Sequence, residues 1–189
     1  GDTWAAVSTG LTINYNFTGL VAVGNKLYAT TADGTSNSEL IEFDGSSWHE
    51  RTTAQSSSGG LNGVWFAKGQ LIIAGNDGTV VRVWAITPFN QTWDSSVLKD
   101  VSGTMTLFGQ TNIAFEEVHS IAASEGIIFI GTKDASKSVG RFYTAQLVAQ
   151  DNLYVLANRQ LIKEWDISGQ DTTPKHMFVS RDSVYMGIK

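Results

Sequence analysis

The sequence predicts an all-β protein, and three observations support this. Short runs of apolar and β-branched residues alternate with turn residues along most of the chain. Asp-Gly pairs, a strong short-range signal for a hairpin turn, begin at Asp33, Asp44 and Asp77. Apolar residues at helical spacing are nearly absent. We therefore expect antiparallel sheets, with any helix limited to a turn or two near residues 114–118, a segment that could equally form a strand.

Composition narrows the range of functions. The 189 residues are 42% hydrophobic, which is enough to bury a substantial core. The net charge is −5 and no Lys/Arg cluster occurs, so nucleic-acid binding is disfavoured. The chain has no cysteine, which excludes disulfides, thiolate catalysis and cysteine-ligated metals. No stretch approaches the ~20 apolar residues of a membrane span, so we expect no membrane insertion.

One hairpin pattern recurs five times along the chain. Its first strand is a short apolar run, and its second strand follows after a tight turn. The first strands begin at Gly19, Gly63, Ser120, Gln146 and Met177, and the second strands begin at Leu27, Leu71, Ile127, Leu153 and Val184. Continuous apolar runs of this kind predict strands covered on both faces. The expected core therefore comprises Val21, Val23, Tyr28, Ile72, Ala74, Ile128, Ile130, Val155 and Tyr185.

A third, more polar strand follows most of the hairpins. Its copies lie at residues 40–43, 81–84, 140–143 and 161–165, and each places a charged residue close to an aromatic one. This alternation predicts a strand with one buried face and one face in water.

Apolar inner strands followed by alternating outer strands fit small sheets arranged radially, and in this the chain resembles β-propeller repeat proteins. The turn at residues 44–48 (Asp-Gly-Ser-Ser-Trp) is similar to turns of kelch-like and sialidase-like repeats. Trp165-Asp166 ends a strand as the WD dipeptide does in WD-like blades. The resemblance covers nearly the whole chain and implies a β-propeller of about four to five irregular blades.

The expected organisation is a single propeller-like domain over residues 1–189. Its blades would span approximately residues 5–48, 49–93, 94–146 and 147–176, with a partial blade at 177–189. Trp4, Trp48 and Trp93 recur at nearly equal spacing and mark the blade ends. An insert at residues 98–118 lengthens the third repeat, whereas the interval from Ile127 to Leu153 is too short for four strands. We therefore expect a propeller that is incomplete or is completed by another chain segment.

The candidate ligand-binding residues are aromatic and amide or carboxylate side chains near turns: Trp48, Trp93, Asp33, Asp77, Asn76 and Asn90. Tryptophan beside Asn or Asp is a pattern that stacks and hydrogen-bonds sugar rings. Two structural explanations compete with this one. Tryptophans at repeat spacing are mostly packing residues, and Asp before Gly is favoured by the turn itself.

No catalytic or metal-ligating pattern emerges, and we expect no cofactor. His49, His119 and His176 lie far apart and outside known metal-binding spacings. Glu116 and Glu117 are adjacent, and neighbours on a strand point to opposite faces, so they cannot share a proton. If the chain had hydrolytic activity, these two carboxylates and His119 would be the first place to look.

These observations favour a non-enzymatic β-propeller module for structural assembly or surface recognition in an extracellular or virion-type particle. Low charge, abundant Ser, Thr and Gly, and the absence of cysteine resemble phage tail or fibre parts and bacterial surface proteins. Protein partners or self-association are expected, because the strand at residues 184–188 has an unprotected edge. A glycan-binding, lectin-like propeller is the alternative. A carbohydrate-active enzyme of sialidase or glycosidase type is the second alternative, and it would need two converging carboxyl groups.

Overall fold

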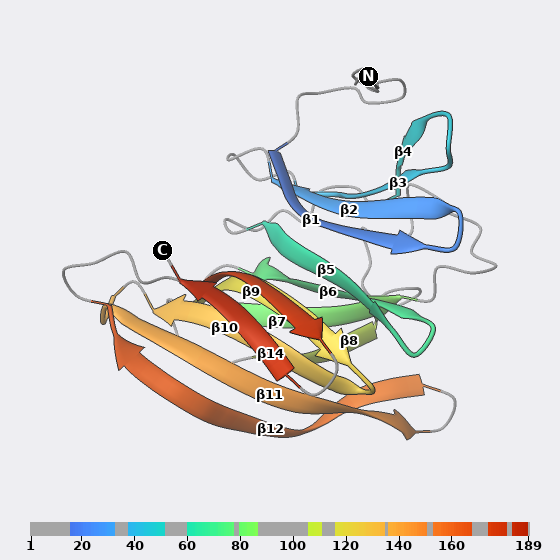
Figure 1. Ribbon diagram of the computed structural model, residues 1–189. Coiled ribbons are helices and arrows are strands. Elements are labelled where there is room, and N and C mark those ends of the chain that lie inside the picture. The colour runs from blue at the N-terminus through green and yellow to red at the C-terminus, as the bar shows by residue number, and fades with distance from the viewer. Residues whose placement is uncertain are drawn as a thin grey trace.

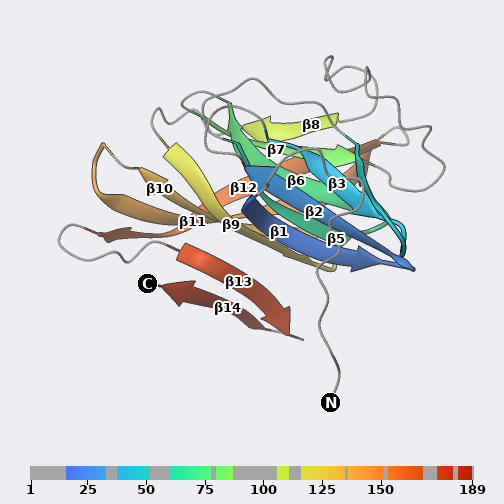
Figure 2. The same ribbon diagram turned by 90° about the horizontal axis from the view of Figure 1, so that it is seen from above.

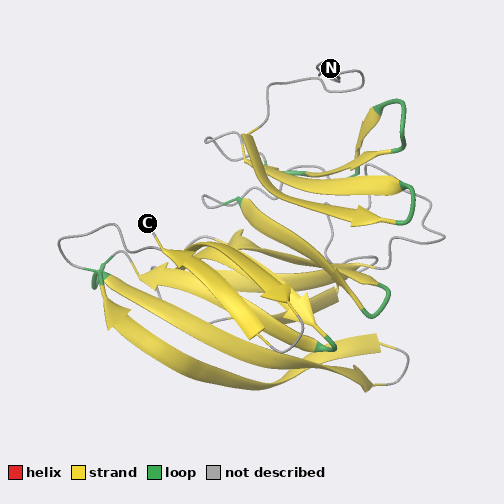
Figure 3. Ribbon diagram, in the orientation of Figure 1, coloured by secondary structure: helices red, strands yellow, loops and turns green. Residues whose placement is uncertain are grey.

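The computed structural model describes residues 16–32, 38–51, 60–77, 80–86, 106–110, 116–134, 136–150, 153–167, 174–180 and 183–188. This part of the chain forms fourteen β-strands and contains no helix (Figures 1 and 3). All strand pairs are antiparallel. The prediction of an all-β protein with antiparallel sheets is confirmed, and Glu116 begins a strand rather than a helical turn.

The strands form four sheets, and within each sheet neighbours in space are neighbours in sequence. The first sheet contains β1 (Asn16–Val23), β2 (Lys26–Ala32), β3 (Leu40–Phe43) and β4 (Trp48–Glu50). The second contains β5 (Leu61–Ala67), β6 (Gln70–Asp77), β7 (Val80–Ile86) and β8 (Thr106–Gln110). The third contains β9 (Glu116–Ser124), β10 (Ile127–Asp134), β11 (Val139–Gln150) and β12 (Leu153–Asp166). The fourth is the hairpin of β13 (Pro174–Ser180) and β14 (Ser183–Ile188).

All five predicted hairpins form: β1–β2, β5–β6, β9–β10, β11–β12 and β13–β14. Two of them have two-residue turns in which both central residues adopt positive φ. These turns are Lys68-Gly69, with φ of 48° and 77°, and Glu125-Gly126, with φ of 48° and 90°. Such turns match the right-handed twist of the flanking strands, and glycine is the residue that adopts positive φ at no steric cost.

The β11–β12 hairpin, the fourth of the five along the chain, is part of the third sheet. β11 pairs with β10 through its first part and with β12 along nearly its whole length. The expected repeat boundary near residue 146 therefore falls inside one continuous strand, which accounts for the short interval between Ile127 and Leu153. The expected insert at residues 98–118 contains β8, the fourth strand of the second sheet, and the start of β9.

Successive sheets pack face to face, and most of the core lies between them. Between the first and second sheets, Tyr28 and Leu40 pack in one cluster with Val64, Ile73 and Trp84. Between the second and third sheets, a second cluster joins Ile72, Ala74, Val81, Val83 and Ala85 to Val118, Ile121, Ala123, Ile128, Ile130 and Tyr143. The second sheet is thus covered on both faces, which explains why its strands are continuously apolar.

The expected core is largely correct. Val23, Tyr28, Ile72, Ala74, Ile128 and Ile130 are buried, Val21 is partly buried, and the side chain of Val155 lies outside the described part of the chain. Tyr185 was expected in the core and is not: half of its surface is exposed. The reason is its place on β14, which pairs only with β13 among the described strands.

The expectation for the third strands also needs correction. Their charged residues were expected on a face in water, yet Glu42 on β3 and Arg141 on β11 are buried. Glu42 lies on the same face of β3 as Leu40, which packs against the second sheet, and Arg141 lies on the third sheet, which contacts both the second sheet and β13. A charged residue buried in this way must be paired. Both residues are held in ion-pair networks, as described below.

The first strands of the four sheets lie next to one another in chain order. β1 contacts β5, β5 contacts β9, and β9 contacts β13 (Figures 1 and 2). The second strand of each sheet also contacts the first strand of the next, in the pairs β2–β5, β6–β9 and β10–β13. The same inter-sheet relation is therefore repeated three times along the described chain.

Candidate functional site

The first strand of each of the four sheets carries a β-bulge at the same position. Going away from the hairpin turn, five residues of this strand pair with the second strand, and the register then skips the sixth residue. The skipped residues are Thr18 on β1, Asn62 on β5, His119 on β9 and Lys175 on β13. Bulges re-aim side chains and sharpen the twist of a strand. All four residues are polar, whereas the strands that carry them are mostly apolar.

Two of these bulge residues tie one sheet to the next. The Thr18 hydroxyl donates a 2.6 Å hydrogen bond to the carbonyl oxygen of Leu61, and the Asn62 amide donates a 3.1 Å bond to the carbonyl oxygen of Val118. Leu61 and Val118 each immediately precede the bulge residue of the next sheet. The same contact is therefore made at successive sheet interfaces.

Glycines allow these strands to approach closely. A Cβ atom at Gly19 would lie 2.7 Å from the backbone nitrogen of Val64 and 3.0 Å from the Cα of Gly63. A Cβ atom at Gly63 would lie 2.6 Å from the Cγ2 of Ile121. Gly19 and Gly63 both follow a bulge residue, so the close contact between first strands recurs with the sheets.

Three of the bulge residues, Thr18, Asn62 and His119, line a cavity of about 170 Å³, which we call the inner pocket. It is formed by side chains and backbone of all four first strands, from the bulge position and the residues that follow it. Its lining residues are Thr18, Gly19, Leu20, Asn62, Gly63, Val64, Trp65, His119, Ser120, Ile121 and Met177. These residues provide hydroxyl, amide, imidazole, indole and aliphatic groups.

Ser120 is the most suggestive polar group in this pocket. Ser120 is buried, and its side-chain oxygen Oγ has no hydrogen-bond partner in the described part of the chain. A buried hydroxyl without a partner is costly, so a ligand or water molecule that bonds to it would be stabilised. Next to it, His119 Nε2 lies 3.6 Å from the Glu117 carboxylate, which is an ion-pair distance but too long for a hydrogen bond.

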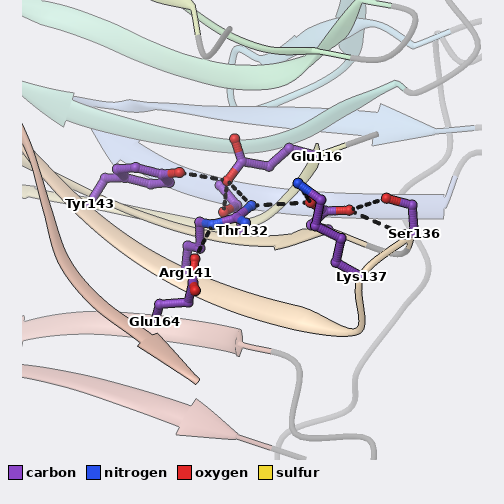
Figure 4. Close-up of polar contacts among 8 residues, drawn as sticks. Glu116, Thr132, Ser136, Lys137, Arg141, Tyr143 and Glu164 are labelled. Atoms are coloured by element: carbon purple, nitrogen blue, oxygen red, sulfur yellow. Dashed lines mark hydrogen bonds and ion pairs between the residues drawn. The ribbon is translucent and has the colours of Figure 1, made fainter. Parts of the chain in front are cut away.

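A buried ion-pair network occupies the core-facing side of the third sheet (Figure 4). Glu116 on β9 accepts hydrogen bonds through Oε1 from the Thr132 hydroxyl at 2.5 Å and the Tyr143 hydroxyl at 2.9 Å. The Arg141 guanidinium lies 3.6 Å from the same oxygen. Four strands thus meet around Arg141, because Glu164 on β12 also accepts a 2.7 Å bond from its Nε.

Arg141 also faces Asp134, at 3.4 Å, so three carboxylates surround one guanidinium. Burial alone would raise the pKa of Asp134. The hydrogen bonds from Ser136 and Arg141, with the charges of Lys137 and Arg141, outweigh burial and lower it. Fixed cations and hydroxyls thus surround the buried carboxylates, which is the arrangement of a structural network.

The first sheet contains a second network of this kind around Glu42. Lys26 Nζ and Arg51 both bond to its Oε1 at 2.8 Å. Burial raises the pKa of Glu42, but hydrogen bonds from Lys26, Arg51 and Tyr28 outweigh it and hold the pKa below its ordinary value. Burial and the neighbouring Glu42 carboxylate raise the pKa of Tyr28.

The sequence-predicted ligand residues do not gather at one place. Trp48 is buried and packs against Phe17 and Phe43, with ring centroids 5.6 and 5.2 Å apart. Asn76 is buried, and its Oδ1 accepts a 3.0 Å bond from the Val118 amide, which joins β6 to β9. Of Asp77 only the backbone is described, at the end of β6, and Asp33, Asn90 and Trp93 lie outside the described residues.

Asp44, the aspartate of one Asp-Gly pair, stabilises the turn in which it lies. Asp44 Oδ1 accepts bonds from the backbone amides of Ser46 and Ser47 at 2.8 and 2.9 Å, and Oδ2 lies 2.8 Å from His49 Nε2. These bonds, that from Ser47 foremost, lower the Asp44 pKa. This is the turn-stabilising role that Asp has before Gly.

Sequence reasoning did not identify Thr18, Asn62 or Ser120 as site residues. A signal existed, since a polar residue precedes Gly or Ser in three of the apolar first strands. Within the described ranges, no group of three His, Asp or Glu residues is placed to hold a metal ion. The described residues also include no helix long and apolar enough to cross a membrane.

No protein-family model and no curated protein matches the chain. Among solved structures, the computationally designed Ika4 protein is similar over 99% of this chain and 94% of its own, with 14% identity and a TM-score of 0.56. A "putative 6-phosphogluconolactonase" from Bacteroides uniformis is similar over 89% of this chain, with 18% identity and a TM-score of 0.50, and this chain spans 49% of its length. At these identities the likeness concerns the fold alone: several small antiparallel sheets, similar to those of propeller-type proteins.

Proposed function

We propose that this chain is a non-enzymatic β-propeller module for surface recognition and assembly in an extracellular or virion-type particle. In this proposal each of the four sheets is one blade, and the fourth blade includes the β13–β14 hairpin. The inner pocket lies on the propeller axis and receives part of a protein partner. The observation that carries the proposal is the lining of this pocket.

The radial arrangement is supported by repetition. Each inter-sheet contact is made by the same strand positions, and two of them share the same bulge-to-carbonyl hydrogen bond. A relation that repeats with a fixed rotation places equivalent strands around one axis. Two structural neighbours, with TM-scores of 0.56 and 0.50, are propeller-type proteins, which agrees with this arrangement.

The chemistry of the pocket supports binding rather than turnover. Its described lining includes hydroxyl, amide and imidazole groups but no Asp or Glu. Hydrolysis of a glycosidic bond uses two carboxyl groups that flank the bond. The buried carboxylates Glu42, Glu116 and Asp134 are instead bound to Lys or Arg side chains in the sheets.

The size of the pocket indicates what it can hold. Its volume of about 170 Å³ is below the ~300–1,000 Å³ typical of pockets for drug-sized ligands. A single projecting side chain with a polar tip fits such a site, with its tip at the Ser120 hydroxyl and its stem against Trp65 and Leu20. Partner residues that anchor in a pocket of this kind contribute much of the affinity of an interface.

Assembly is proposed to use a different surface, the outer edge of β14. Among the described strands β14 pairs only with β13, and Tyr185 on it is half exposed. An apolar edge with free backbone groups can add a strand from another molecule. This edge would allow the chain to associate with identical subunits.

The recognition proposal is tested with N-acetyl amino-acid amides as minimal side-chain probes. Titrations followed by NMR should give saturable shifts of the Ser120 and His119 amides with at least one probe that has a polar tip. Leu20→Trp should block these shifts, because Leu20 lines the pocket yet is 58% exposed and tolerates a larger side chain. The matched control is Leu161→Trp, at a 50% exposed leucine outside the pocket lining.

Three outcomes would contradict the proposal. The first is the absence of saturable shifts with every probe, and the second is shifts that persist unchanged in Leu20→Trp. The third is hydrolysis of a chromogenic glycoside or ester that is lost in Glu117→Gln or His119→Ala, since that would make the chain an enzyme.

A further inference from the structure

A second cavity lies at one end of the third sheet, and none of its lining residues is shared with the inner pocket. It has a volume of about 520 Å³, within the range of ligand sites, and we call it the outer pocket. It lies between the turn from β10 to β11 and the end of β12. Its lining residues are Ser136, Lys137, Ser138, Val139, Glu164, Trp165 and Asp166.

Trp165 provides an aromatic surface in this pocket. It is paired in register with Gly140 on β11, and a Cβ atom at Gly140 would lie only 2.5 Å from Cε2 of the indole. The indole therefore lies directly against the glycine backbone, where any other residue would displace it. The ring remains half-buried and lines the pocket, so it is held in place while part of it stays accessible.

The polar groups around the indole are held by the network of the third sheet. Asp134 accepts bonds from the Ser136 hydroxyl at 2.6 Å and the Ser136 amide at 3.1 Å, which fixes the turn. Lys137 Nζ is 3.8 Å from Asp134 and largely exposed. Glu164 is half-exposed, and its bond to Arg141 fixes its carboxylate. An ammonium donor and a carboxylate acceptor thus line the same pocket as the indole.

We infer that the outer pocket binds a neutral carbohydrate. The apolar face of a sugar ring stacks on Trp165, and its hydroxyls donate to the Glu164 carboxylate and accept from the Lys137 ammonium. Two carboxylates and one ammonium line the pocket, so an acidic sugar is repelled. This inference does not depend on the inner pocket and adds a second binding site to the proposed recognition module.

The test uses the 189-residue chain and a panel of neutral trisaccharides built from glucose, galactose or N-acetylglucosamine. Binding is followed by NMR at the Trp165 indole N–H, which is assigned from its loss in Trp165→Phe. At least one trisaccharide should cause a saturable shift. Trp165→Ala should weaken its binding by about tenfold, a loss typical of removing an aromatic stacking partner.

Two further variants keep the test decisive if Trp165→Ala perturbs the sheet. Lys137→Ala changes an exposed turn residue and should weaken binding several-fold without affecting the strands. Leu20→Trp, which fills the inner pocket, should leave saccharide affinity unchanged. The saccharide test of the outer pocket can therefore fail or succeed independently of the side-chain test of the inner pocket.

Three results would overturn the inference. The first is the absence of a saturable shift with every trisaccharide at about 20 mM, a concentration well above the millimolar dissociation constants of weak ligands. The second is equal affinity of the wild type, Trp165→Ala and Lys137→Ala for the trisaccharide. The third is tighter binding of an acidic saccharide such as a sialylated lactose.

Discussion

The Thr18 hydroxyl donates a 2.6 Å hydrogen bond to the carbonyl oxygen of Leu61, and this bond joins β1 of the first sheet to β5 of the second. Thr18 is the residue that the β1–β2 register skips, and Leu61 directly precedes the residue skipped in β5–β6. A bulge in one hairpin is therefore fixed to the bulge of the next. Asn62 and Val118 repeat the relation one sheet further along.

Removing the Thr18 hydroxyl should weaken the contact between the first two sheets. Thr18→Val keeps the shape of the side chain and leaves the Leu61 carbonyl without this donor, so we expect a loss of about 1 kcal/mol in the free energy of unfolding. Urea denaturation measures the loss, with Thr144→Val on β11 as a control. Equal stability of Thr18→Val and the wild type would show that the bond does not hold the sheets together.

Ile72 tests the packing between the second and third sheets. It is fully buried, so Ile72→Ala should lower the free energy of unfolding by ~2–5 kcal/mol. Ile162→Ala on β12 is the matched control: its side chain is exposed, and the change should stay within about 0.5 kcal/mol. If Ile72→Ala cost less than about 0.5 kcal/mol, the face-to-face packing of these sheets would be wrong.

The hairpins could be predicted from the sequence because their signals are local. Apolar runs beginning at Leu27, Leu71 and Ile127 each follow a short turn, and turn chemistry with strand propensity is enough to find them. The way the hairpins assemble is not local. The apolar run at 146–149 reads as a new first strand, whereas in the structure it extends β11.

The candidate site was harder to predict for the same reason. Glu42 and Arg141 look like solvent-facing residues of alternating strands, and only the stacking of sheets shows that they are buried and paired. The inner pocket is built from short segments of hairpins about fifty positions apart. No spacing within one hairpin reveals that Thr18, Asn62 and His119 converge. Trp48 stands out in the sequence, yet it packs between Phe17 and Phe43.

The Glu42 network predicts a pH dependence of stability. The folded-state pKa of Glu42 is below its ordinary value of 4.5, so the unfolded chain binds more protons in this range. The stabilisation is fully present above about pH 4.5 and is lost as the pH falls through the lower folded-state pKa. Glu42→Gln removes this titration and also removes the carboxylate to which Lys26 and Arg51 bond.

We therefore expect Glu42→Gln to be less stable than the wild type at pH 7, by roughly 1–3 kcal/mol. The difference should narrow as the pH is lowered from 5 to 3, and urea denaturation across this range measures it. Glu50→Gln controls for the loss of one negative charge at an exposed position. A gap that is constant or widens toward acid pH would contradict the assigned direction of the pKa shift.

The edge of β14 predicts self-association. Sedimentation velocity should show the 189-residue chain associating as its concentration rises, and Tyr185→Lys should reduce this by placing a charge on the exposed strand. The control variant is Tyr185→Thr, which also replaces the tyrosine and keeps a high strand propensity but introduces no charge. A monodisperse monomer at all concentrations, with strongly protected amides at residues 184–188, would show that the edge is already paired within one chain.

The first strands of the four sheets lie side by side in chain order around the inner pocket. Nuclear Overhauser effects test it most directly, because Gly19 and Gly63 approach the next strand more closely than a Cβ atom would allow. We predict cross-peaks from a Gly19 Hα to the Val64 amide proton and from a Gly63 Hα to the Ile121 γ2-methyl. If both are absent from an assigned spectrum in which these glycines show contacts only within their own hairpins, the arrangement of sheets and the pocket that depends on it are wrong.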